Sequence, residues 1–444
     1  MRRRDLLLTA FAPAGTRLNL RDAAAVHTRI AEKHARGQKI WGRIGGSAAE
    51  HESAAALAGQ LKPFLSEAGL ESFSFEAHRA LDWEIRCGGK LLETAMPAPF
   101  EARFPEQVPA TVFVTADPDS ENWSTVAGKW AFVRSPATTS TAFNIVREKL
   151  LYQRAVKHGA AGLLFVIQTP RSSRWRSVVP VDKPYALKDE RYPGGLRPIP
   201  CFSVDAIDGD TLAASAGATI SARIRYHESR KYEGRNVVGV LKGSGEHGTG
   251  ILCHLDSFFT GACDNASGIA AMAGLAQSLS RLPARVRKTD FHFLGLSAHH
   301  DEAAGMRDWV SRDPARFARI RHLFLLEHVD ALDIEEGRRA GWPMPLNNNR
   351  TAYLGAEGWP EVRKLLPALV RQSGVMSVTP EMQNACIADL FVTCGQAKSF
   401  CLMNTPPYYH TGHDTLDKIS DAGIWNAVEF HRLLLRGLGL IGDG

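Results

Sequence analysis

The sequence lacks the features that mark several classes of protein. No run of 18 apolar residues occurs in the 444-residue chain, so no transmembrane helix is predicted. The seven cysteines are odd in number and show no Cys-x-x-Cys spacing, which argues against a thiolate zinc site and against a disulfide framework. The formal net charge of +6 is not collected in blocks, so nucleic-acid binding is not indicated. With 44% hydrophobic and 23% charged residues, the composition is that of a globular protein, and at this length we expect two domains.

The N-terminal residues 1–14, MRRRDLLLTAFAPA, have the layout of an export signal. Arg3 and Arg4 precede an apolar run, and the run leads into Ala12-Pro13-Ala14 as a possible cleavage site. This order resembles a twin-arginine signal with a short apolar run. It predicts an exported, periplasmic protein, and the alternative is a basic N-terminus on a cytoplasmic protein.

The most informative stretch is 250–268, GILCHLDSFFTGACDNASG. An apolar strand ends at His254, and Asp264 stands just before a predicted helix. Imidazole nitrogen and carboxylate oxygen are zinc ligands, so His254 and Asp264 are candidates for a metal site. Alternate residues of a strand share a face, which places Asp256 to orient His254 through its other ring nitrogen. The alternative is an ordinary polar turn between a strand and a helix.

The periodicity on either side of this stretch predicts an α/β fold. Near the N-terminus we expect a helix at 21–34 and another that begins with a Ser47–Glu50 capping box and runs to Gly69. After Asn236 strands alternate with helices up to a last helix at 424–438. The predicted strands are 237–241, 251–253, 290–296, 323–326 and 400–402. This order implies a mainly parallel sheet with helices on both faces and ligands at the carboxyl ends of its strands.

Polar clusters fall at the predicted ends of these strands. The clusters are His254, Asp256 and Asp264; Ser297–Glu302; Glu327–His328; and Tyr408–Asp414. A single histidine is more often a satisfied structural residue than a metal ligand. Because all four clusters occupy equivalent positions in a parallel sheet, we expect them to form one site.

The segment between the N-terminal helices and the alternating region after Asn236 has a different composition, with proline-rich turns and short β runs. GKWAFVR, REKLLYQRAVKHGAAGLLFV and IPCFSVDAIDGDTL resemble the pattern of a protease-associated domain. That module has no chemistry of its own and usually covers or shapes a neighbouring active site. We therefore predict a discontinuous catalytic domain at 15–90 and 229–444 with a β-rich α/β insert at 91–228. The alternative is a second α/β domain without that relationship.

With these residues placed, the chain resembles the two-zinc aminopeptidase family, which also includes glutamate carboxypeptidase, glutaminyl cyclase and the transferrin receptor. HLDSFFTGACDNASG and YYHTGHDTLDKI are similar to the family's two ligand motifs, and ADLFVTCGQAKSF is similar to its serine–aspartate segment, with Ala388 in place of the serine. The resemblance implies that His254 binds one zinc ion, that Asp264 bridges two, and that His410 binds the other.

Departures from the family concentrate at the site. The family has a glutamate pair, a general base followed by a metal ligand, where this chain has His299 and His300. Glu327 stands where the family has an aspartate ligand. The metal ligands would then be His254, Asp264, His300, Glu327 and His410. Two carboxylates on metal instead of three should weaken the binding of a second ion.

The resemblance and the departures predict a metal-dependent hydrolase of an amide bond in a peptide or small amide. Imidazole can accept the proton of the attacking water, so His299 is the candidate general base, and Asp256 is expected to orient His254. His328, Asp301, Glu302 and His413 adjoin the clusters as supporting residues. The alternative is an inactive binding protein on the same scaffold, and glutaminyl-cyclase chemistry is a weaker third reading. The resemblance places substrate specificity in loops such as 346–357.

Overall fold

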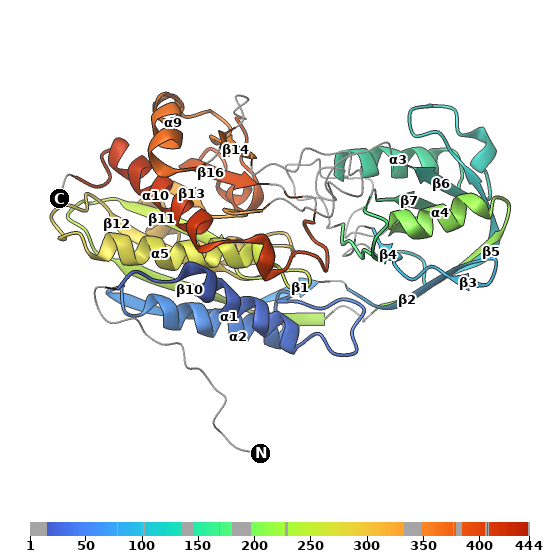
Figure 1. Cartoon of the computed structure of the whole chain (residues 1–444), viewed down its shortest axis with the longest axis horizontal. Helices are drawn as coiled ribbons and strands as arrows, with labels where there is room; N and C mark the ends of the chain where they lie inside the picture. Colours follow the sequence, from blue (N-terminus) through green and yellow to red (C-terminus); the bar gives the residue numbers. More distant parts are fainter. Residues whose placement is uncertain are drawn as a thin grey trace, which may run out of the picture.

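The computed structural model describes residues 16–442 except 78, 99, 101–102, 135–144, 168, 180–196, 227–229, 333–348, 376, 379–383, 405 and 407. The proposed export signal at 1–14 lies outside the described residues, as does part of the loop 346–357. The described chain forms two lobes, each built on its own β-sheet (Figure 1).

The first sheet holds the strands predicted from the alternating pattern. Its order is β1-β10-β12-β11-β13-β16-β14-β15, in which β12, β11, β13 and β16 are mutually parallel and the flanking β10 and β14 are antiparallel. The bounds are β1 Glu67–Ala77, β10 Arg230–Leu241, β11 Gly248–His254, β12 Asp290–Leu296, β13 Ile320–Leu325, β14 Asn349–Tyr353, β15 Ser377–Val378 and β16 Lys398–Asn404. The predicted mixed, mainly parallel sheet is confirmed.

Helices cover both faces of this sheet, as the apolar character of its central strands requires. In β11 the side chains of Ile251 and Cys253 enter one core, whereas Leu252 enters the core on the opposite face. The first face is covered by α1 Leu20–Lys33, α2 Ala48–Leu61, α5 Gly268–Ser280, α9 Pro360–Ser373 and α10 Asp421–Gly437. The second face is covered by α6 Ala304–Arg312, α7 Pro314–Ala318 and the short helix η5 Ala388–Thr393.

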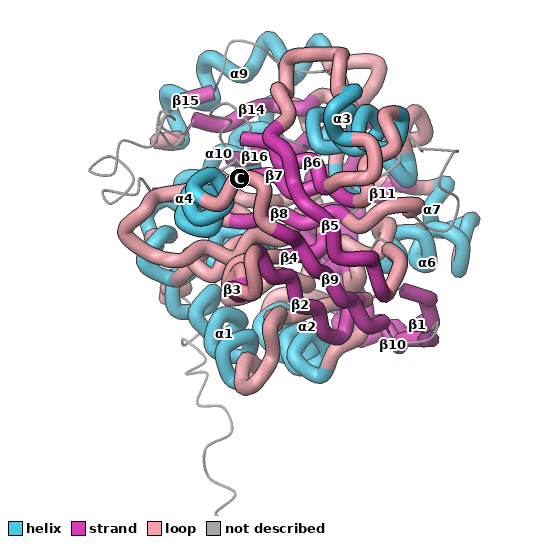
Figure 2. Tube along the Cα trace, turned by 90° about the vertical axis from the view of Figure 1, so that its right-hand side faces the viewer, coloured by secondary structure: helices cyan, strands magenta, loops and turns pink. Residues whose placement is uncertain are grey.

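The second sheet has the order β3-β2-β9-β5-β6-β7-β8-β4, and β5 to β8 are its parallel part. Figure 2 shows this lobe end-on, with β2, β9 and β5 crossing the front of the molecule. Its elements are β2 Ala80–Cys87, β3 Lys90–Leu91, β4 Met96–Pro97, β5 Gln107–Thr115, β6 Trp130–Arg134, α3 Ile145–Lys157, β7 Gly162–Val166, β8 Cys201–Val204, α4 Ala206–Ala214 and β9 Thr219–Tyr226. The division of the chain at 91 and 228 stays a prediction, and the hydrogen bonding joins β2 to this second sheet through β9.

The N-terminal helices differ from the expectation in one respect. The second helix ends at Leu61 and β1 begins at Glu67, so the predicted continuation to Gly69 is wrong. Pro63 lacks an N–H and cannot extend the helical hydrogen bonding. The Ser47 hydroxyl does cap the helix by accepting the Glu50 N–H at 3.2 Å. The Glu50 carboxylate instead accepts the Gly46 N–H at 2.6 Å and the Ala298 N–H at 2.9 Å.

Large side chains from each lobe are buried in the hydrophobic core of the other lobe. Trp175, from the chain segment between β7 and β8, is buried in the hydrophobic core of the first sheet. Phe258 and Phe259, which follow β11, are buried in the core of the second sheet. Each lobe therefore contributes to the packing of the other, close to the carboxyl end of β11.

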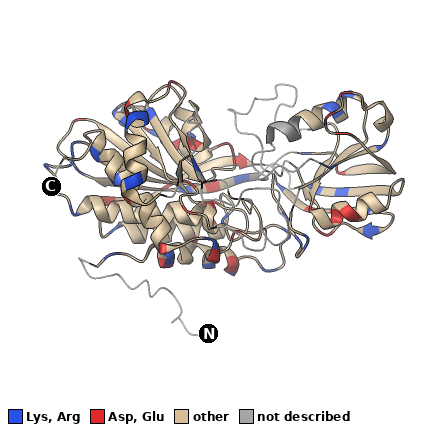
Figure 3. Cartoon of the chain, turned by 45° about the horizontal axis from the view of Figure 1, so that its top comes forward, with Lys and Arg blue, Asp and Glu red and all other residues tan. Residues whose placement is uncertain are grey.

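The surface and the helices bear on two further expectations. In the view of Figure 3, basic and acidic residues are interspersed over both lobes, in keeping with the even distribution along the sequence. Among the described residues, no helix combines the length and apolarity that a membrane crossing needs.

Candidate metal centre

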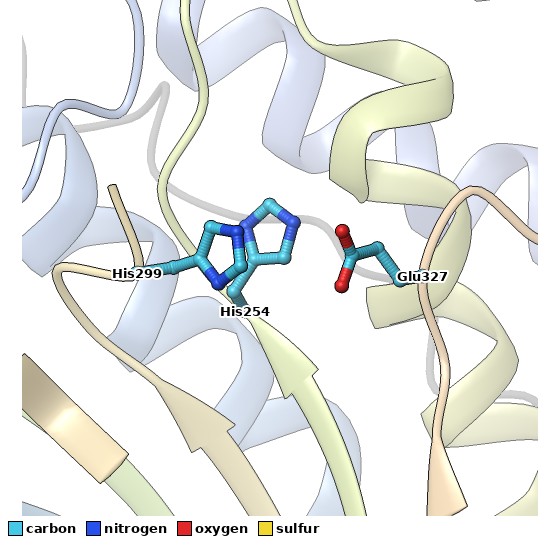
Figure 4. Close-up of side chains that lie close together, drawn as sticks. All are labelled: His254, His299 and Glu327. Carbon is cyan, nitrogen blue, oxygen red and sulfur yellow. The ribbon is translucent and has the colours of Figure 1, made fainter. Parts of the chain in front are cut away.

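The predicted polar clusters converge at the carboxyl ends of β11, β12, β13 and β16. His254 is the last residue of β11, His299 follows β12, and Glu327 follows β13. Figure 4 shows the His254 and His299 rings side by side, with the Glu327 carboxylate pointing toward them from the opposite side. One ligand atom from each of these three buried side chains lies within 4.8 Å of the others. The parallel sheet thus brings together residues that are up to 73 positions apart in the sequence, from 254 to 327.

Asp264 is the centre of the cluster. Its Oδ1 lies 3.0 Å from His254 Nε2 and 2.9 Å from His328 Nε2, and its Oδ2 lies 3.0 Å from His410 Nε2. The backbone is held in place by Asp414, whose carboxylate accepts the Asp264 N–H at 3.0 Å. The side chain therefore reaches both halves of the cluster, as a bridging ligand must.

Asp256 holds the loop that carries His299 and His300. Its carboxylate accepts the N–H groups of both residues at 3.1 and 3.0 Å, and it accepts His300 Nδ1–H at 2.7 Å. The ring Nδ1 of His254 lies 3.0 Å from the backbone oxygen of Asp256 and 3.5 Å from its carboxylate. Asp256 thus contacts His254 as expected, but its closest side-chain bond orients His300.

The second half of the cluster consists of Asp264, His300 and His410, whose ligand atoms also lie within 4.8 Å of one another. The Nε2 atoms of His300 and His410 are 3.0 Å apart. Phe258 packs against both rings, with centroid distances of 4.5 and 4.9 Å. Because His300 Nδ1 is bonded to Asp256, its Nε2 is the nitrogen directed at His410 and Asp264.

The second lobe touches the site through its backbone. The segment 174–178 runs beside the loop 410–413, where Val178 N–H donates to the His410 carbonyl at 3.0 Å. The Val178 carbonyl lies 3.3 Å from His410 Nδ1 and can accept its hydrogen. Trp175 stacks on His413 at a centroid distance of 3.7 Å. The second lobe thereby fixes which ring nitrogen of His410 faces the cluster.

The charges of the cluster compensate one another in a buried environment. Burial alone would raise the pKa of Asp264, but the imidazoles of His328 and His254 outweigh it and hold that pKa well below the usual range. Burial would likewise lower the pKa of His254, and the Asp256 and Asp264 carboxylates outweigh it and raise the pKa. A metal ion would have to displace a proton from His254 on binding.

The pKa of His410 is shifted in the opposite direction from that of His254. Burial, reinforced by His300 and His328 and opposed by Asp264, lowers its pKa to about 3. Its imidazole is therefore neutral near pH 7 and offers a lone pair at Nε2, which is the protonation state that a metal requires.

The residues present fit zinc. Three buried atoms in the cluster make no hydrogen bond of good geometry: His254 Nε2, Asp264 Oδ2 and Glu327 Oε2. Unsatisfied buried polar atoms cost free energy, and they are tolerated where an ion or ligand completes them. Imidazole nitrogens and carboxylate oxygens at this spacing are the donors that zinc takes in catalytic sites.

Backbone strain gathers around the cluster as well. His328 and His410 have φ values of 48° and 56°, in the left-handed region that non-glycine residues rarely occupy. Such conformations cost of order 1–3 kcal/mol each and persist where surrounding contacts impose them. Here His328 Nδ1 donates to the Asn404 carbonyl at 2.9 Å, which holds its ring against Asp264.

All seven predicted site residues lie in this one cluster: His254, Asp256, Asp264, His299, His300, Glu327 and His410. Of the adjoining residues, His328 contacts Asp264 directly, while Asp301 pairs with Arg79 at 2.7 Å and Glu302 is exposed. The individual roles of these residues stay predictions.

The sequence reasoning missed two carboxylates and a disulfide. Asp389 contacts His299, and Asp414 holds the Asp264 backbone, although both stood inside the quoted motifs. Cys386 and Cys394 form a disulfide, contrary to the expectation drawn from cysteine spacing. The other five cysteines are buried and form no disulfide. An eight-residue separation carries no recognised pairing pattern, so only the fold shows this bond.

Comparison with known proteins bears on the family pattern and the fold. Residues 236–356 match the model of Peptidase family M28. The zinc aminopeptidase BSAP from Bacillus subtilis is 17% identical over 93% of this chain and 95% of its own, with a TM-score of 0.64. The Peptidase M28 precursor from Shewanella amazonensis is 16% identical over 96% of each chain, with a TM-score of 0.67.

The aminopeptidase from Aneurinibacillus sp. strain AM-1 is 18% identical over 93% of this chain and 91% of its own, with a TM-score of 0.58. No curated protein matches the chain in sequence. The predicted resemblance is confirmed: residues 236–356 carry the pattern of peptidase family M28, and the chain has the fold of the zinc aminopeptidases.

Proposed function

We propose that this protein is a zinc-dependent exopeptidase-type hydrolase that cleaves an amide bond in a peptide or a small amide. The observation that carries the proposal is the convergence of buried nitrogen and oxygen donors from four strand ends on one space. The match to Peptidase family M28 supports the reaction class, and the described zinc aminopeptidases of the same fold support the metal.

His254, Asp264 and Glu327 would hold one ion, and His300 and His410 would complete a second position that shares Asp264. Zinc, when bound, supplies Lewis-acid polarisation of the scissile carbonyl and acidification of a water. Because one ligand carboxylate of the resembling family is absent, we expect fewer than two ions to be held tightly. Elemental analysis after dialysis against a mild chelator measures this, and two retained ions would contradict the charge argument.

His299 would move the proton. Its ring lies beside that of His254, with centroids 4.1 Å apart, so its outer nitrogen reaches the space that the ligands surround. From there it can take a proton from the attacking water and pass it to the leaving amine. Buried apolar groups such as Phe258 limit access of bulk water to this space.

The test uses the purified full chain loaded with zinc. Aminoacyl anilides, dipeptides and peptide amides are offered as substrates, and turnover is followed with zinc content. In His299→Ala we expect zinc to be retained while turnover falls by roughly a hundredfold to ten-thousandfold. His299→Glu restores the glutamate of the family that this chain resembles, and it should retain part of the activity. Loss of zinc in His299→Ala would make this residue a ligand instead.

The competing function is a binding protein that has lost catalysis. The specific observation that favours it is the replacement of the family's glutamate pair by His299 and His300. Zinc binding without turnover of any substrate in the panel would support that reading and overturn the hydrolase proposal.

We also propose that the protein is exported. The support is the twin-arginine layout of residues 1–14, together with the Cys386–Cys394 disulfide, which is typical of oxidising compartments. Cell fractionation of wild type and of an Arg3→Lys, Arg4→Lys double variant tests it. The variant should stay in the cytoplasm, and an uncleaved N-terminus on cytoplasmic wild-type protein would disprove export.

A further inference from the structure

The His299 ring is held by a carboxylate from a distant part of the chain. His299 Nδ1 lies 2.7 Å from Asp389 Oδ2, across 90 residues of sequence. Asp389 is fully buried, and the His299 side chain is only 3% exposed. The short distance and the burial mark a buried hydrogen bond rather than a surface contact.

This bond decides which nitrogen of the ring carries the hydrogen. Because an ionised carboxylate has acceptor sites only, the ionised form of Asp389 requires Nδ1 of His299 to donate. In a neutral imidazole the hydrogen on Nδ1 leaves Nε2 with its lone pair. Since Nδ1 is directed to Asp389, Nε2 is the nitrogen directed toward His254 and Glu327 (Figure 4).

Asp389 is itself anchored by the structure around it. It sits in η5, between Cys386 and Cys394, whose disulfide closes the segment with a Cα–Cα distance of 5.7 Å. The next residue, Leu390, is buried in the core beneath the sheet. Ala388, just before it, has a φ of 48°, so the backbone turns sharply to present the carboxylate. The position of Asp389 is therefore imposed by packing and a covalent bond.

We propose that Asp389 is a positioning residue that fixes the Nδ1–H tautomer of His299 and so keeps Nε2 available to accept a proton. The base would then be a carboxylate–imidazole pair rather than the single carboxylate of the resembling family. The catalytic consequence rests on the proposed function, whereas the tautomer itself does not. A wrong tautomer at such a pair costs orders of magnitude in turnover, although the geometry stays intact.

The experiment compares Asp389→Asn, Asp389→Glu and the matched control Thr393→Val in the zinc-loaded full chain. Thr393 is buried in the same short helix, where its hydroxyl donates to Leu390 carbonyl. For Asp389→Asn we expect kcat to fall by roughly a hundredfold to ten-thousandfold, with KM changed less than about threefold and zinc content retained. Asp389→Glu should recover part of kcat, and Thr393→Val should leave it within about twofold.

A second readout does not depend on activity. Nuclear magnetic resonance of isotope-labelled histidine reports which nitrogen carries the hydrogen, and His299→Gln assigns the signal. We expect hydrogen on Nδ1 of His299 in wild type and its loss or transfer to Nε2 in Asp389→Asn. Hydrogen on Nε2 in the wild-type ring would overturn the proposal even if both Asp389 variants failed to fold.

The outcomes separate this proposal from the proposed function. If no substrate is cleaved, the hydrolase proposal fails, and the tautomer measurement still decides the role of Asp389. If wild type is active but Asp389→Asn keeps kcat within about threefold, the positioning role is wrong. A loss of kcat that is matched by equal losses of zinc and of thermal stability would show a merely structural pair and would also overturn it.

Discussion

Both sheets of this protein have carboxylates at their strand ends, but these carboxylates differ in their hydrogen-bond partners. Both have a parallel centre and both place carboxylates at strand ends, with Asp264 near β11 and Asp205 after β8. Asp205 accepts the Asp208 N–H at 2.8 Å and the Trp175 N–H at 3.1 Å, so protein donors satisfy both of its oxygens. Asp264 Oδ2 and Glu327 Oε2 lack such donors.

What differs is therefore the supply of protein donors rather than the topology. At the second sheet, strand-end carboxylates cap a helix and hold a loop, and no candidate metal group occurs there among the described residues. At the first sheet, histidines from several loops face the carboxylates and leave oxygen and nitrogen atoms to a ligand. A strand-end carboxylate therefore becomes part of a metal site only where protein donors leave its oxygen atoms without a hydrogen bond.

The largest expected effect of a substitution is at Asp264. In Asp264→Ala we expect zinc to be lost and turnover to fall by about a thousandfold or more, because both halves of the cluster share this carboxylate. The measurements are zinc per chain and kcat. Zinc should also raise the melting temperature of wild type but not that of the variant. A variant that keeps zinc and activity would remove Asp264 from the centre.

In the helix that Asp205 caps, the Asp208 carboxylate accepts Thr94 N–H at 2.8 Å, Thr94 Oγ1–H at 2.7 Å and Arg174 at 2.7 Å. Asp208→Ala leaves the buried Thr94 donors without an acceptor, and we expect a loss of about 3 kcal/mol in unfolding free energy with zinc content unchanged. Asp210→Ala is the matched control in the same helix. Its ion pairs are exposed, so its effect should stay below about 1 kcal/mol. Equal losses of unfolding free energy in Asp208→Ala and Asp210→Ala would contradict a stabilising role for the buried hydrogen bonds of Asp208.

His27 is a buried histidine of the first lobe that lies outside the cluster. Burial, with a smaller effect from Arg43, lowers its pKa to about 3. A folded-state pKa below the unfolded value of about 6.5 contributes stability above pH 6.5, and that stability is lost as the pH falls toward 3. Between pH 7 and pH 5 we expect His27 to account for a loss of about 2 kcal/mol in unfolding free energy.

Urea unfolding at the two pH values measures this effect. His27→Gln should remove most of the loss, whereas the control His247→Gln, at an exposed position, should not. If wild type and His27→Gln lose the same free energy between pH 7 and pH 5, acid sensitivity arises elsewhere.

The smallest predicted effect lies where the two lobes meet. Val178→Pro removes the N–H that donates to the His410 carbonyl, and we expect zinc to bind about tenfold more weakly because the ring of His410 is less well oriented. Ser177→Ala is the control, since its hydroxyl makes no hydrogen bond in the structure and its backbone pairing stays. Chelator competition measures the affinity. Equal affinities for Val178→Pro and wild type would show that the second lobe does not tune the site.

Much of the first lobe was predictable because its signals are local. The apolar runs around Ile251, Phe293 and Phe400 are short and regularly separated by helical segments, and that alternation predicts a parallel sheet. His254 and Glu327 stand directly after such runs, so their meeting at one edge follows from the topology alone. The helix end at Leu61 was misjudged, although Pro63 carried the signal.

Strand periodicity and parallel order were therefore enough to predict the sheet and the edge that carries the site, because they place strand ends together. The family resemblance then selected the seven residues within the strand-end clusters. Only the tertiary structure decided that Asp256 bonds His300, that Asp389 holds His299, and that Cys386 pairs with Cys394. These contacts depend on how loops pack after the sheet has formed, and loop packing leaves no period in the sequence. Whether a buried carboxylate is satisfied by protein donors or left to a metal is set by those same long-range contacts.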